Sequence, residues 1–562
     1  MKNPKQIIDR ILSKKIVPNP LTLQSLYQYS VANFAQFPSI AFAGNEPITY
    51  GEFGKKTDEI AHLLFAAGLR QGDKVAILSQ NMPNWVIAYF AIVSSGLVVV
   101  PIMADFSSKE VEDVLQHSQT KAIFISERQI PKIQKSYIPS ISFEVKLDDF
   151  SIIKDNSDKN LSNNEDFTQP TVKEDDLAAL IYTSGTTGRS KGVMLTHKNI
   201  TWNAVQCAQF HQIESSDVFL SFLPLSHTYE NTIGMIYPIM YGSSIYYLEK
   251  PPTPAALLPA LEKIRPTVMC SVPLVMEKIY KTQVQSKFTK NKFIRSIYKT
   301  PIFRIIIHRI AGKKLAKVFG GRLVFFGIGG SKIDSRVERF LKEAKFPYAI
   351  GYGLTETSPL VAGAGVSQTK IQSTGFAIQD VEIQLVDKNK KGVGEIWVKG
   401  PNVMQGYYKN PELTAEILTE DGWFKTGDLA YMDSKGRIYI KGRSKSTIVG
   451  ANGENIYPED IESVINNQEF VVESLVVEEN GFLVAKVLPN LEELEKYIEN
   501  IRLNVENRKE RYQFWKENVK HEINARLNKV SQIKRIDIVE EPFEKTASMK
   551  IKRFLYTKNK KK

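Results

Sequence analysis

The chain has 562 residues with 43% hydrophobic and 24% charged content, which excludes a disordered or fibrous protein and predicts several packed domains. Two cysteines, Cys207 and Cys270, are too few for a disulfide framework or a cysteine metal site, so a reducing compartment is expected. The net charge of +13 is local, because residues 281–322 hold twelve Lys or Arg and residues 545–562 hold eight, with no acid in either. The remainder of the chain has a net charge of −7, which disfavours a general nucleic-acid-binding function.

Two segments of the N-terminal half are candidates for a signal peptide or a membrane-spanning segment, and neither has the expected pattern. The first twenty residues lack the apolar core of a signal peptide, so we expect a cytoplasmic protein. Residues 85–103 carry no charge, but Ser94, Ser95 and Gly96 divide them. This stretch therefore predicts a core helix followed by a core strand rather than a membrane span.

Helical and strand patterns alternate from residue 50 onward, which is typical of layered α/β folds with a largely parallel sheet. Residues 153–176 are polar and predict an exposed connector. Hairpin patterns with Gly and Asp turns precede residue 445, and a small α/β unit with long charged helices follows it. We expect a large N-terminal α/β domain over 1–443 and a small mobile α/β domain over 444–562. The predicted helices lie at 51–68, after Asn81 and at 108–117, and the predicted strands at 74–78, 98–101, 121–125 and 177–182.

The segment YTSGTTGRSKG, residues 182–192, follows the buried strand at 177–182. Backbone N–H groups of Gly and small hydroxyl residues can form an anion-binding nest, and Lys191 can add a point charge. It is not a Walker A loop, because Ser190 stands where that motif needs Gly. On its own the segment fits either a phosphate loop or a plain flexible turn.

The basic segment 281–322 interleaves its cations with apolar residues such as Phe293, Tyr298 and Phe303. This pattern suits surface helices attracted to anionic ligands or to the inner face of an anionic membrane. An ordinary solvated basic face explains it equally well.

Seven motifs occur in an order that resembles the adenylate-forming enzymes, which include acyl- and aryl-CoA synthetases, luciferases and peptide-synthetase adenylation domains. The resemblance covers roughly residues 20 to 553. It implies ATP and Mg²⁺ as cofactors and a reaction in which a carboxylate attacks the α-phosphate. The motifs are YTSGTTGRSKG (182–192), LPLSHTYE (223–230), GIGGSKI (327–333), GYGLTET (351–357), GWFKTGD (422–428), GRIYIKGRSK (436–445) and KTASMKIKR (545–553).

The resemblance assigns a role to each site residue. Glu356 and Thr183 would hold Mg²⁺, Thr355 would contact the α-phosphate, and His227 would lie near the activated carboxyl. Asp428, on a predicted turn beside Gly427, would accept the ribose hydroxyls with support from Arg443. The phosphates would be bound by Thr183, Ser184, Gly185, Thr186, Thr187, Gly188 and Lys191, and the adenine by Gly330, Ser331 and Tyr352. Gly353 would also belong to the nucleotide-binding site.

Lys550 is the expected catalytic residue, since the resemblance has it bridge the carboxylate and α-phosphate oxygens. Rotation of the small domain about the hinge Lys445 would then withdraw Lys550 and admit CoA as co-substrate. The chain departs from the common pattern at Met549, where Gly is usual, and at Ser190, where many members have Pro. Long-chain fatty acyl-CoA synthetases resemble this chain in having Met or Leu before the lysine.

VPLVMEKIY, residues 272–280, is similar to a stretch of long-chain acyl-CoA synthetases, although Leu274 replaces their common Arg. A medium- or long-chain fatty acid and CoA are therefore the expected substrates. The alternatives are an acyl-ACP synthetase acting with an acyl carrier protein, an acyl-AMP ligase, or a non-catalytic nucleotide- and lipid-binding protein.

Overall fold

The computed structural model describes residues 15–134, 136, 138–156, 168–184, 190–285, 298, 300–449, 455–500, 508–545 and 551–557. The chain divides into two compact units. Unit 1 comprises Met1–Ile383, Val398–Phe424 and Ser434–Ile438, and unit 2 comprises Gln384–Trp397, Lys425–Asp433 and Tyr439–Lys562. The expected boundary between residues 443 and 444, at which the mobile domain would begin, stays a prediction.

The first sheet of unit 1 has eight strands in the order β19-β9-β8-β4-β3-β5-β6-β7. Its centre is parallel and buried, and antiparallel pairs flank it on both sides. The strands are β3 (Lys74–Leu78), β4 (Val98–Ile102), β5 (Ala122–Ile125), β6 (Phe143–Lys146), β7 (Ile152–Asp155), β8 (Leu177–Ser184), β9 (Ser190–Thr196) and β19 (Gly406–Tyr407).

The second sheet of unit 1 has nine strands in the order β16-β15-β14-β13-β12-β10-β11-β1-β2. Its central strands are parallel, which places their carboxyl ends at one edge. The strands are β1 (Pro38–Phe42), β2 (Ile48–Thr49), β10 (Val218–Ser221), β11 (Ser244–Tyr247), β12 (Val268–Ser271), β13 (Phe325–Ile328), β14 (Tyr348–Gly353), β15 (Leu360–Ala364) and β16 (Phe376–Ala377).

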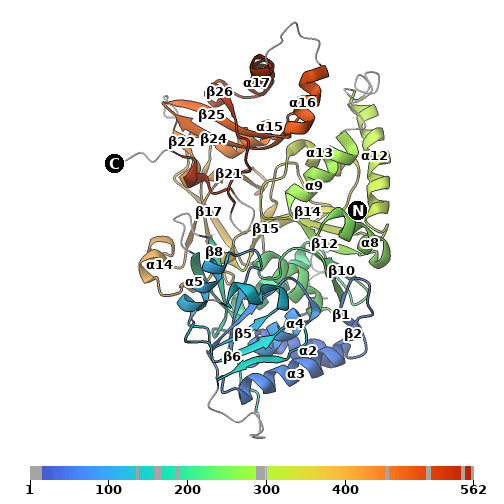
Figure 1. The fold of residues 1–562 in the computed structure, drawn as a ribbon, viewed down its shortest axis with the longest axis vertical. Helices are drawn as coiled ribbons and strands as arrows, with labels where there is room; N and C mark the ends of the chain where they lie inside the picture. The colour runs from blue at the N-terminus through green and yellow to red at the C-terminus, as the bar shows by residue number, and fades with distance from the viewer. Residues whose placement is uncertain are drawn as a thin grey trace. The chain divides into compact units, whose positions relative to one another are not determined.

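Helices of unit 1 cover both sheets (Figure 1). Several begin with a side-chain cap; Thr49 and Glu52 form a capping box at the start of α3, for example. The helices are α2 (Leu23–Phe34), α3 (Tyr50–Ala66), α4 (Pro83–Ser94), α5 (Ser108–Ser118), α6 (His197–Gln206), α7 (Tyr237–Met240), α8 (Pro254–Ile264), α9 (Pro273–Ile279), α12 (Pro301–Val318), α13 (Ser335–Glu343) and α14 (Pro411–Ile417).

The uncharged stretch at 85–103 forms most of helix α4 and all of strand β4, as predicted. Pro83 occupies the first turn of α4, and every residue from Trp85 to Ser94 is buried. Strand β4 is buried along its whole length. Within the described residues, no helix is long and apolar enough to cross a membrane.

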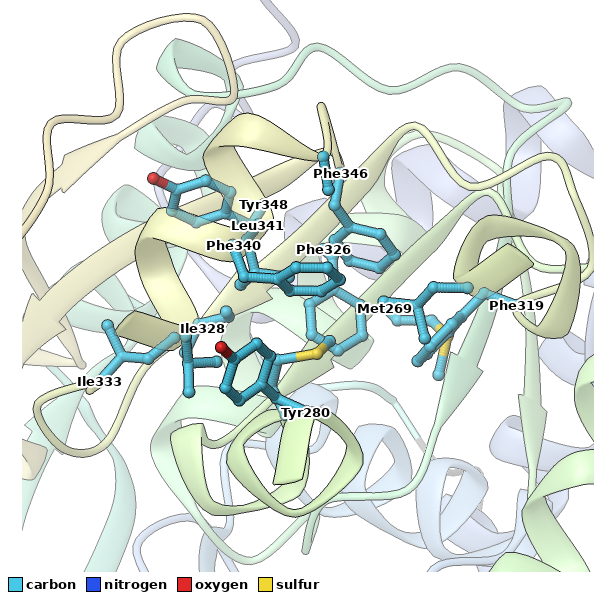
Figure 2. Packing of buried hydrophobic residues seen from close by; sticks show 14 of the residues in the cluster. Met269, Tyr280, Phe319, Phe326, Ile328, Ile333, Phe340, Leu341, Phe346 and Tyr348 are labelled. Atoms are coloured by element: carbon cyan, nitrogen blue, oxygen red, sulfur yellow. The ribbon is translucent and has the colours of Figure 1, made fainter. Parts of the chain in front are cut away.

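An aromatic cluster packs against strands β13 and β14 of the nine-stranded sheet, mainly near their amino-terminal ends (Figure 2). Phe326 on β13 contacts Phe319 and Phe346, with ring centroids 5.4 Å apart in both pairs. Phe340 on α13 contacts Tyr280 at 5.2 Å. This packing holds the amino-terminal parts of β13 and β14 in place, and several predicted site residues lie at or beyond the opposite ends of these strands.

Unit 2 contains a three-stranded sheet whose strands β24 and β25 form a long antiparallel pair. Its charged helices were expected from the sequence, and their apolar faces cover one core that includes Ile461, Val476 and Trp515. The elements are β22 (Ile448–Val449), β23 (Asn455–Ile456), α15 (Pro458–Ile465), β24 (Val471–Glu479), β25 (Phe482–Pro489), α16 (Leu491–Asn500), α17 (Arg508–Asn524) and β26 (Arg535–Ile538).

Most of a four-stranded sheet also belongs to unit 2, and it corrects one prediction. Asp428 and Gly427 lie within strand β20 and not in a turn. Burial alternates along this strand, and pairing with two neighbouring strands outweighs the local turn signal of Gly-Asp. The strands are β17 (Glu382–Val386), β18 (Gly394–Lys399), β20 (Phe424–Met432) and β21 (Ile438–Arg443), in the order β17-β18-β20-β21.

The expected connector at 153–176 is also partly wrong. Its first residues belong to strand β7, which pairs with β6 in an antiparallel register. Because β7 is an edge strand with mostly exposed side chains, its sequence lacks the apolar alternation that predicts a strand.

Candidate functional site

The described ends of the Gly-rich segment at 182–192 belong to strands β8 and β9, which pair in an antiparallel register. Thr183 on β8 is directly opposite Lys191 on β9. The predicted phosphate ligands Gly185, Thr186, Thr187 and Gly188 lie outside the described residues. Ser184 and Ser190, the last pair of the ladder, mark where the described strands end.

Glu356 and Lys191 both interact with Tyr407. The Tyr407 hydroxyl donates a hydrogen bond to Glu356 Oε1 over 2.8 Å. Lys191 Nζ lies 5.1 Å from the centre of the Tyr407 ring, within the range of a cation–π contact. The structure thus joins a predicted phosphate ligand and a predicted metal ligand through a tyrosine that the sequence analysis did not single out.

Backbone pairing holds Tyr407 in this place. Strand β19 pairs with β9, with Tyr407 opposite Val193 and Gly406 opposite Met194. The Met404 N–H donates to the Glu356 carbonyl over 3.0 Å, which ties the same segment to the Glu356 turn. The sequence predicts only hairpin patterns for this region, and the tyrosine directly after Gly406 is the one signal that could have pointed to Tyr407.

Thr355 and Glu356 lie on a 3-10 turn that follows strand β14. Gly353 lets the chain enter this turn, because a Cβ there would come within 1.8 Å of the Pro359 carbonyl oxygen. Thr357 is buried and its hydroxyl donates to Pro359 O over 2.6 Å. The close backbone approach therefore fixes the position from which the Glu356 side chain leaves the chain.

His227, Gly330, Ser331 and Tyr352 all lie at or beyond the carboxyl ends of parallel strands in the nine-stranded sheet. His227 follows β10, Gly330 and Ser331 follow β13, and Tyr352 is near the end of β14. Ligands of open α/β sheets bind at this edge. The sheet topology therefore brings these four residues to the edge where a ligand of such a sheet would bind.

His227 is followed by a π-helical turn, Glu230–Ile236, that carries a buried acid. The Tyr229 N–H donates to His227 Nδ1 over 3.2 Å. Glu230 is fully buried, and this burial raises its pKa to about 8, so its carboxyl is largely protonated at neutral pH. The carboxyl fits only because residue 234 is Gly, since a Cβ there would lie 2.5 Å from Glu230 Oε1.

In unit 2, Asp428 and Arg443 form an ion pair. Arg443 Nε lies 2.7 Å from Asp428 Oδ1, with the carboxylate nearly buried and the guanidinium partly exposed. Thr426 supports both, because its hydroxyl accepts from the Asp428 N–H over 3.0 Å and its carbonyl accepts from Arg443 Nη1 over 3.3 Å. The predicted ribose ligands are thus neighbours in adjacent strands.

Lys445 is exposed on the 3-10 turn Ser444–Ser446, immediately after β21. Lys550 lies outside the described residues. The described residues on either side of it form an isolated bridge between Lys545 and Ile551. Arg553 makes an ion pair with the buried Glu462 of α15, which anchors the chain that follows.

The donor chemistry of Thr183 and Glu356 fits a Mg²⁺ ion that is otherwise coordinated by phosphate and water oxygens. Tyr407 engages one carboxylate oxygen of Glu356, and a carboxylate has a second oxygen for a cation. In the described part of the chain, no group of three His, Cys, Asp or Glu side chains could form a metal site by itself. The fit therefore requires a ligand that contributes most of the coordinating oxygens.

The family model and the relatives that match this chain agree with one another. Residues 27–408 match the family described as AMP-binding enzyme. Long chain acyl-CoA synthetase 6, a peroxisomal protein of Arabidopsis thaliana, is 29% identical over 539 residues, covering 86% of this chain and 75% of that protein. A long-chain-fatty-acid–CoA ligase of Rattus norvegicus is 28% identical, covering 80% and 74%. A chloroplastic long-chain-fatty-acid–[acyl-carrier-protein] ligase of Arabidopsis thaliana is 29% identical, covering 80% and 73%.

Solved structures match over nearly the whole chain. ATP-bound MatB from Rhodopseudomonas palustris has a TM-score of 0.75 at 23% identity, covering 95% of this chain and 98% of that one. The O-succinylbenzoate coenzyme A synthetase MenE from Bacillus subtilis, in complex with AMP, has a TM-score of 0.73 at 22% identity, covering 96% and 98%. These matches confirm the expected fold.

The raised pKa of Glu230 makes a testable contribution to stability. An unfolded glutamate loses its proton near pH 4.5, whereas folded Glu230 keeps it up to about pH 8. The free energy of unfolding should therefore fall as pH rises between these values, by up to about 1.4 kcal/mol per pH unit. Glu230→Gln lacks this dependence, so its stability relative to the wild type should increase from about pH 5 to pH 8 in denaturant titrations.

The matched control is Glu382→Gln, which alters an exposed carboxyl of the same unit. Its stability difference from the wild type should stay nearly constant over the same pH range. Parallel curves for Glu230→Gln and the wild type would show that Glu230 is ionised in the folded protein.

Proposed function

The chain belongs to the AMP-binding enzyme family, and we propose that it activates a medium- or long-chain fatty acid with ATP and transfers the acyl group to CoA. In the first step a carboxylate oxygen forms a bond to the α-phosphorus, and the bond from that phosphorus to the diphosphate breaks. In the second step the CoA thiolate attacks the acyl carbonyl, the carbonyl–phosphate bond breaks, and AMP leaves.

The observation that supports this proposal best is the cluster of Lys191, Tyr407 and Glu356. Its lysine and carboxylate come from two separate family motifs, and a hydrogen bond and a cation–π contact bring them to one tyrosine. A reaction that gathers several negative charges needs a fixed cation and a metal ligand close together. A protein that only bound a lipid would have no use for this pair.

In the proposed first step, the hairpin loop with Thr183 to Gly188 and Lys191 binds the phosphates. Thr355 donates to the α-phosphate, and His227 lies beside the fatty carboxyl. Mg²⁺, held by Glu356 and Thr183, would neutralise part of the phosphate charge. Adenine would be bound by Gly330, Ser331 and Tyr352, with Gly353 also in the nucleotide site, and the ribose by Asp428 and Arg443.

Lys550 supplies the remaining positive charge in the proposed first step. Its ammonium group would bridge the attacking carboxylate and the α-phosphate oxygens, which lowers the repulsion between two anions. For the second step, the domain from residue 444 onward would turn about Lys445 and withdraw Lys550. The exposed 3-10 turn that carries Lys445 is suited to absorb such a change, because a solvated lysine loses no packing contacts there.

The proposed acyl chain length and the proposed acceptor are supported by the relatives and by two features of the sequence. The relatives include long-chain acyl-CoA ligases and an acyl-carrier-protein ligase, so the two acceptors are CoA and, as the alternative, a carrier protein. Met549 and the segment at 272–280 favour the long-chain acyl-CoA synthetases.

The function can be tested by supplying ATP, Mg²⁺ and palmitate with either CoA or acyl carrier protein. We expect release of diphosphate in a palmitate-dependent manner and formation of a thioester with CoA. Thioester on the carrier protein alone would replace CoA by the carrier as acceptor. Absence of diphosphate release with fatty acids from medium to long chain length would overturn the proposed activity.

The role of Lys550 predicts a selective defect. Lys550→Ala should lower the adenylation rate by at least about 100-fold, because one charge-stabilising donor of the transition state is lost. Thioester formation from preformed palmitoyl-AMP should remain close to the wild-type rate. Lys552→Ala is the matched control, since it removes a lysine two residues away that lies 3.9 Å from Glu544, and it should leave both rates nearly unchanged. Equal loss of both half-reactions in Lys550→Ala would contradict this role.

Tyr407 predicts a change in the use of Mg²⁺. Tyr407→Phe removes the hydroxyl that orients the Glu356 carboxylate, and a hydrogen bond to a charged group is worth about 1.5–3 kcal/mol. We expect adenylation to fall by about 10-fold at limiting Mg²⁺ and to recover partly at high Mg²⁺. Tyr408→Phe, which removes the neighbouring hydroxyl, should not shift the Mg²⁺ dependence. If Tyr407→Phe and Tyr408→Phe change the Mg²⁺ dependence of adenylation equally, the Tyr407 hydroxyl does not orient Glu356 for the metal ion.

A further inference from the structure

Helix α12 is held to unit 1 by one face only. His308, Gly312 and Leu315 are buried on that face. Gly312 allows close packing against α13, because a Cβ there would lie 2.7 Å from the Cβ of Ala344. Glu343 accepts a hydrogen bond from Arg304 Nη2 over 2.8 Å, and His308 Nδ1 lies 2.7 Å from its other carboxylate oxygen. These contacts fix which side of the helix points away from the protein.

The outer side of α12 carries an unusual set of large apolar residues, which we call the apolar outer patch: Ile302, Phe303, Ile306 and Ile310. Their exposed fractions are 70%, 50%, 48% and 55%. Ile302, Ile306 and Ile310 are spaced by four residues, so they form one row along the helix, and Phe303 lies beside it. Single exposed apolar residues are normal, but a contiguous row on one helix marks an interaction site.

Cations follow the apolar outer patch along the same helix. Arg309, Lys313, Lys314 and Lys317 are exposed, and on a helical projection they share the outer side with the patch. The patch occupies the first half of α12 and the cations lie mainly in its second half. The sequence of α12 contains no acid, and neither does the surrounding segment 281–322.

We propose that the outer side of α12 docks on an anionic lipid surface. The apolar outer patch would enter the boundary between headgroups and acyl chains, where its side chains leave water. The cations of the second half would remain at the level of the lipid phosphates, and their long stems allow this. One partner then satisfies both halves of the helix surface: its acyl chains bury the apolar outer patch, and its phosphates pair with the cations.

Helix α12 docks on this surface without crossing it. With 18 residues and several cations, it is not apolar enough to span a bilayer, in agreement with the absence of spanning helices among the described residues. The proposal is independent of the proposed function, because it concerns binding and can be measured without ATP or fatty acid.

The test uses the full chain and co-sedimentation with vesicles. One set of vesicles contains phosphatidylcholine only, and the other contains phosphatidylcholine with phosphatidylglycerol. We expect binding to the second set that weakens with added salt. Lys313→Gln combined with Lys314→Gln should weaken this binding by about 5-fold for each cation removed.

A second variant tests the apolar half of the surface. Ile302→Ser combined with Ile306→Ser and Ile310→Ser should also lose most of the binding, and thermal unfolding should remain near the wild-type midpoint because these side chains are exposed. Lys55→Gln combined with Lys56→Gln, on the exposed side of α3, is the matched control for charge and should bind like the wild type.

Two outcomes would overturn the proposal. The first is absence of wild-type binding to the anionic vesicles; if the protein then binds an acidic protein such as acyl carrier protein through the same lysines, α12 is a protein-docking surface. The second is equal binding to the anionic vesicles by the wild type, both α12 variants and the α3 control.

Discussion

The short pairing of strand β19 with strand β9 is the contact on which the candidate site of unit 1 depends. It places Tyr407 between two segments that are far apart in the sequence. The tyrosine then uses two properties of one side chain: its hydroxyl donates to Glu356 and its ring faces Lys191. A phenylalanine has the ring for the cation–π contact with Lys191 but no hydroxyl, and a serine has a hydroxyl but no ring.

The same contact connects the two sheets of unit 1. Lys191 belongs to the eight-stranded sheet, and Glu356 follows β14 of the nine-stranded sheet. A hydrogen bond between the Met404 N–H and the Glu356 carbonyl adds a backbone tie to the side-chain one. The geometry of the proposed phosphate and metal ligands is therefore set by sheet packing, which is rigid, and not by the loops alone.

The sequence predicted the local elements well where the signal is local. KVAIL at 74–78 and the buried run at 98–101 form the expected parallel strands, because apolar runs bounded by turn residues leave few alternatives. Tyr407 could not be predicted as a partner of Glu356, since 51 residues separate them and the pairing arises only when two sheets pack. For Asp428 the local sequence signal is present but misleading, because it predicts a turn where the structure has a strand. Its Gly-Asp neighbourhood is a strong local signal, and the ladder that overrides it is formed by distant strands.

Asp428, Glu356 and Glu230 are acids in the motifs of a site that is proposed to bind anionic substrates. Their negative charges must therefore be neutralised. Asp428 is balanced by the guanidinium of Arg443, 2.7 Å away. Glu356 is oriented by a phenol and is suited to a metal ion. Glu230, in the same motif as His227, is kept neutral by burial, which raises its pKa to about 8. An ionised acid without such a partner would repel both the fatty carboxylate and the phosphates. The proposed chemistry therefore requires that every acid in these motifs be paired, metal-bound or protonated. Asp428 is paired and Glu230 is protonated by burial, and the proposed Mg²⁺ would neutralise Glu356.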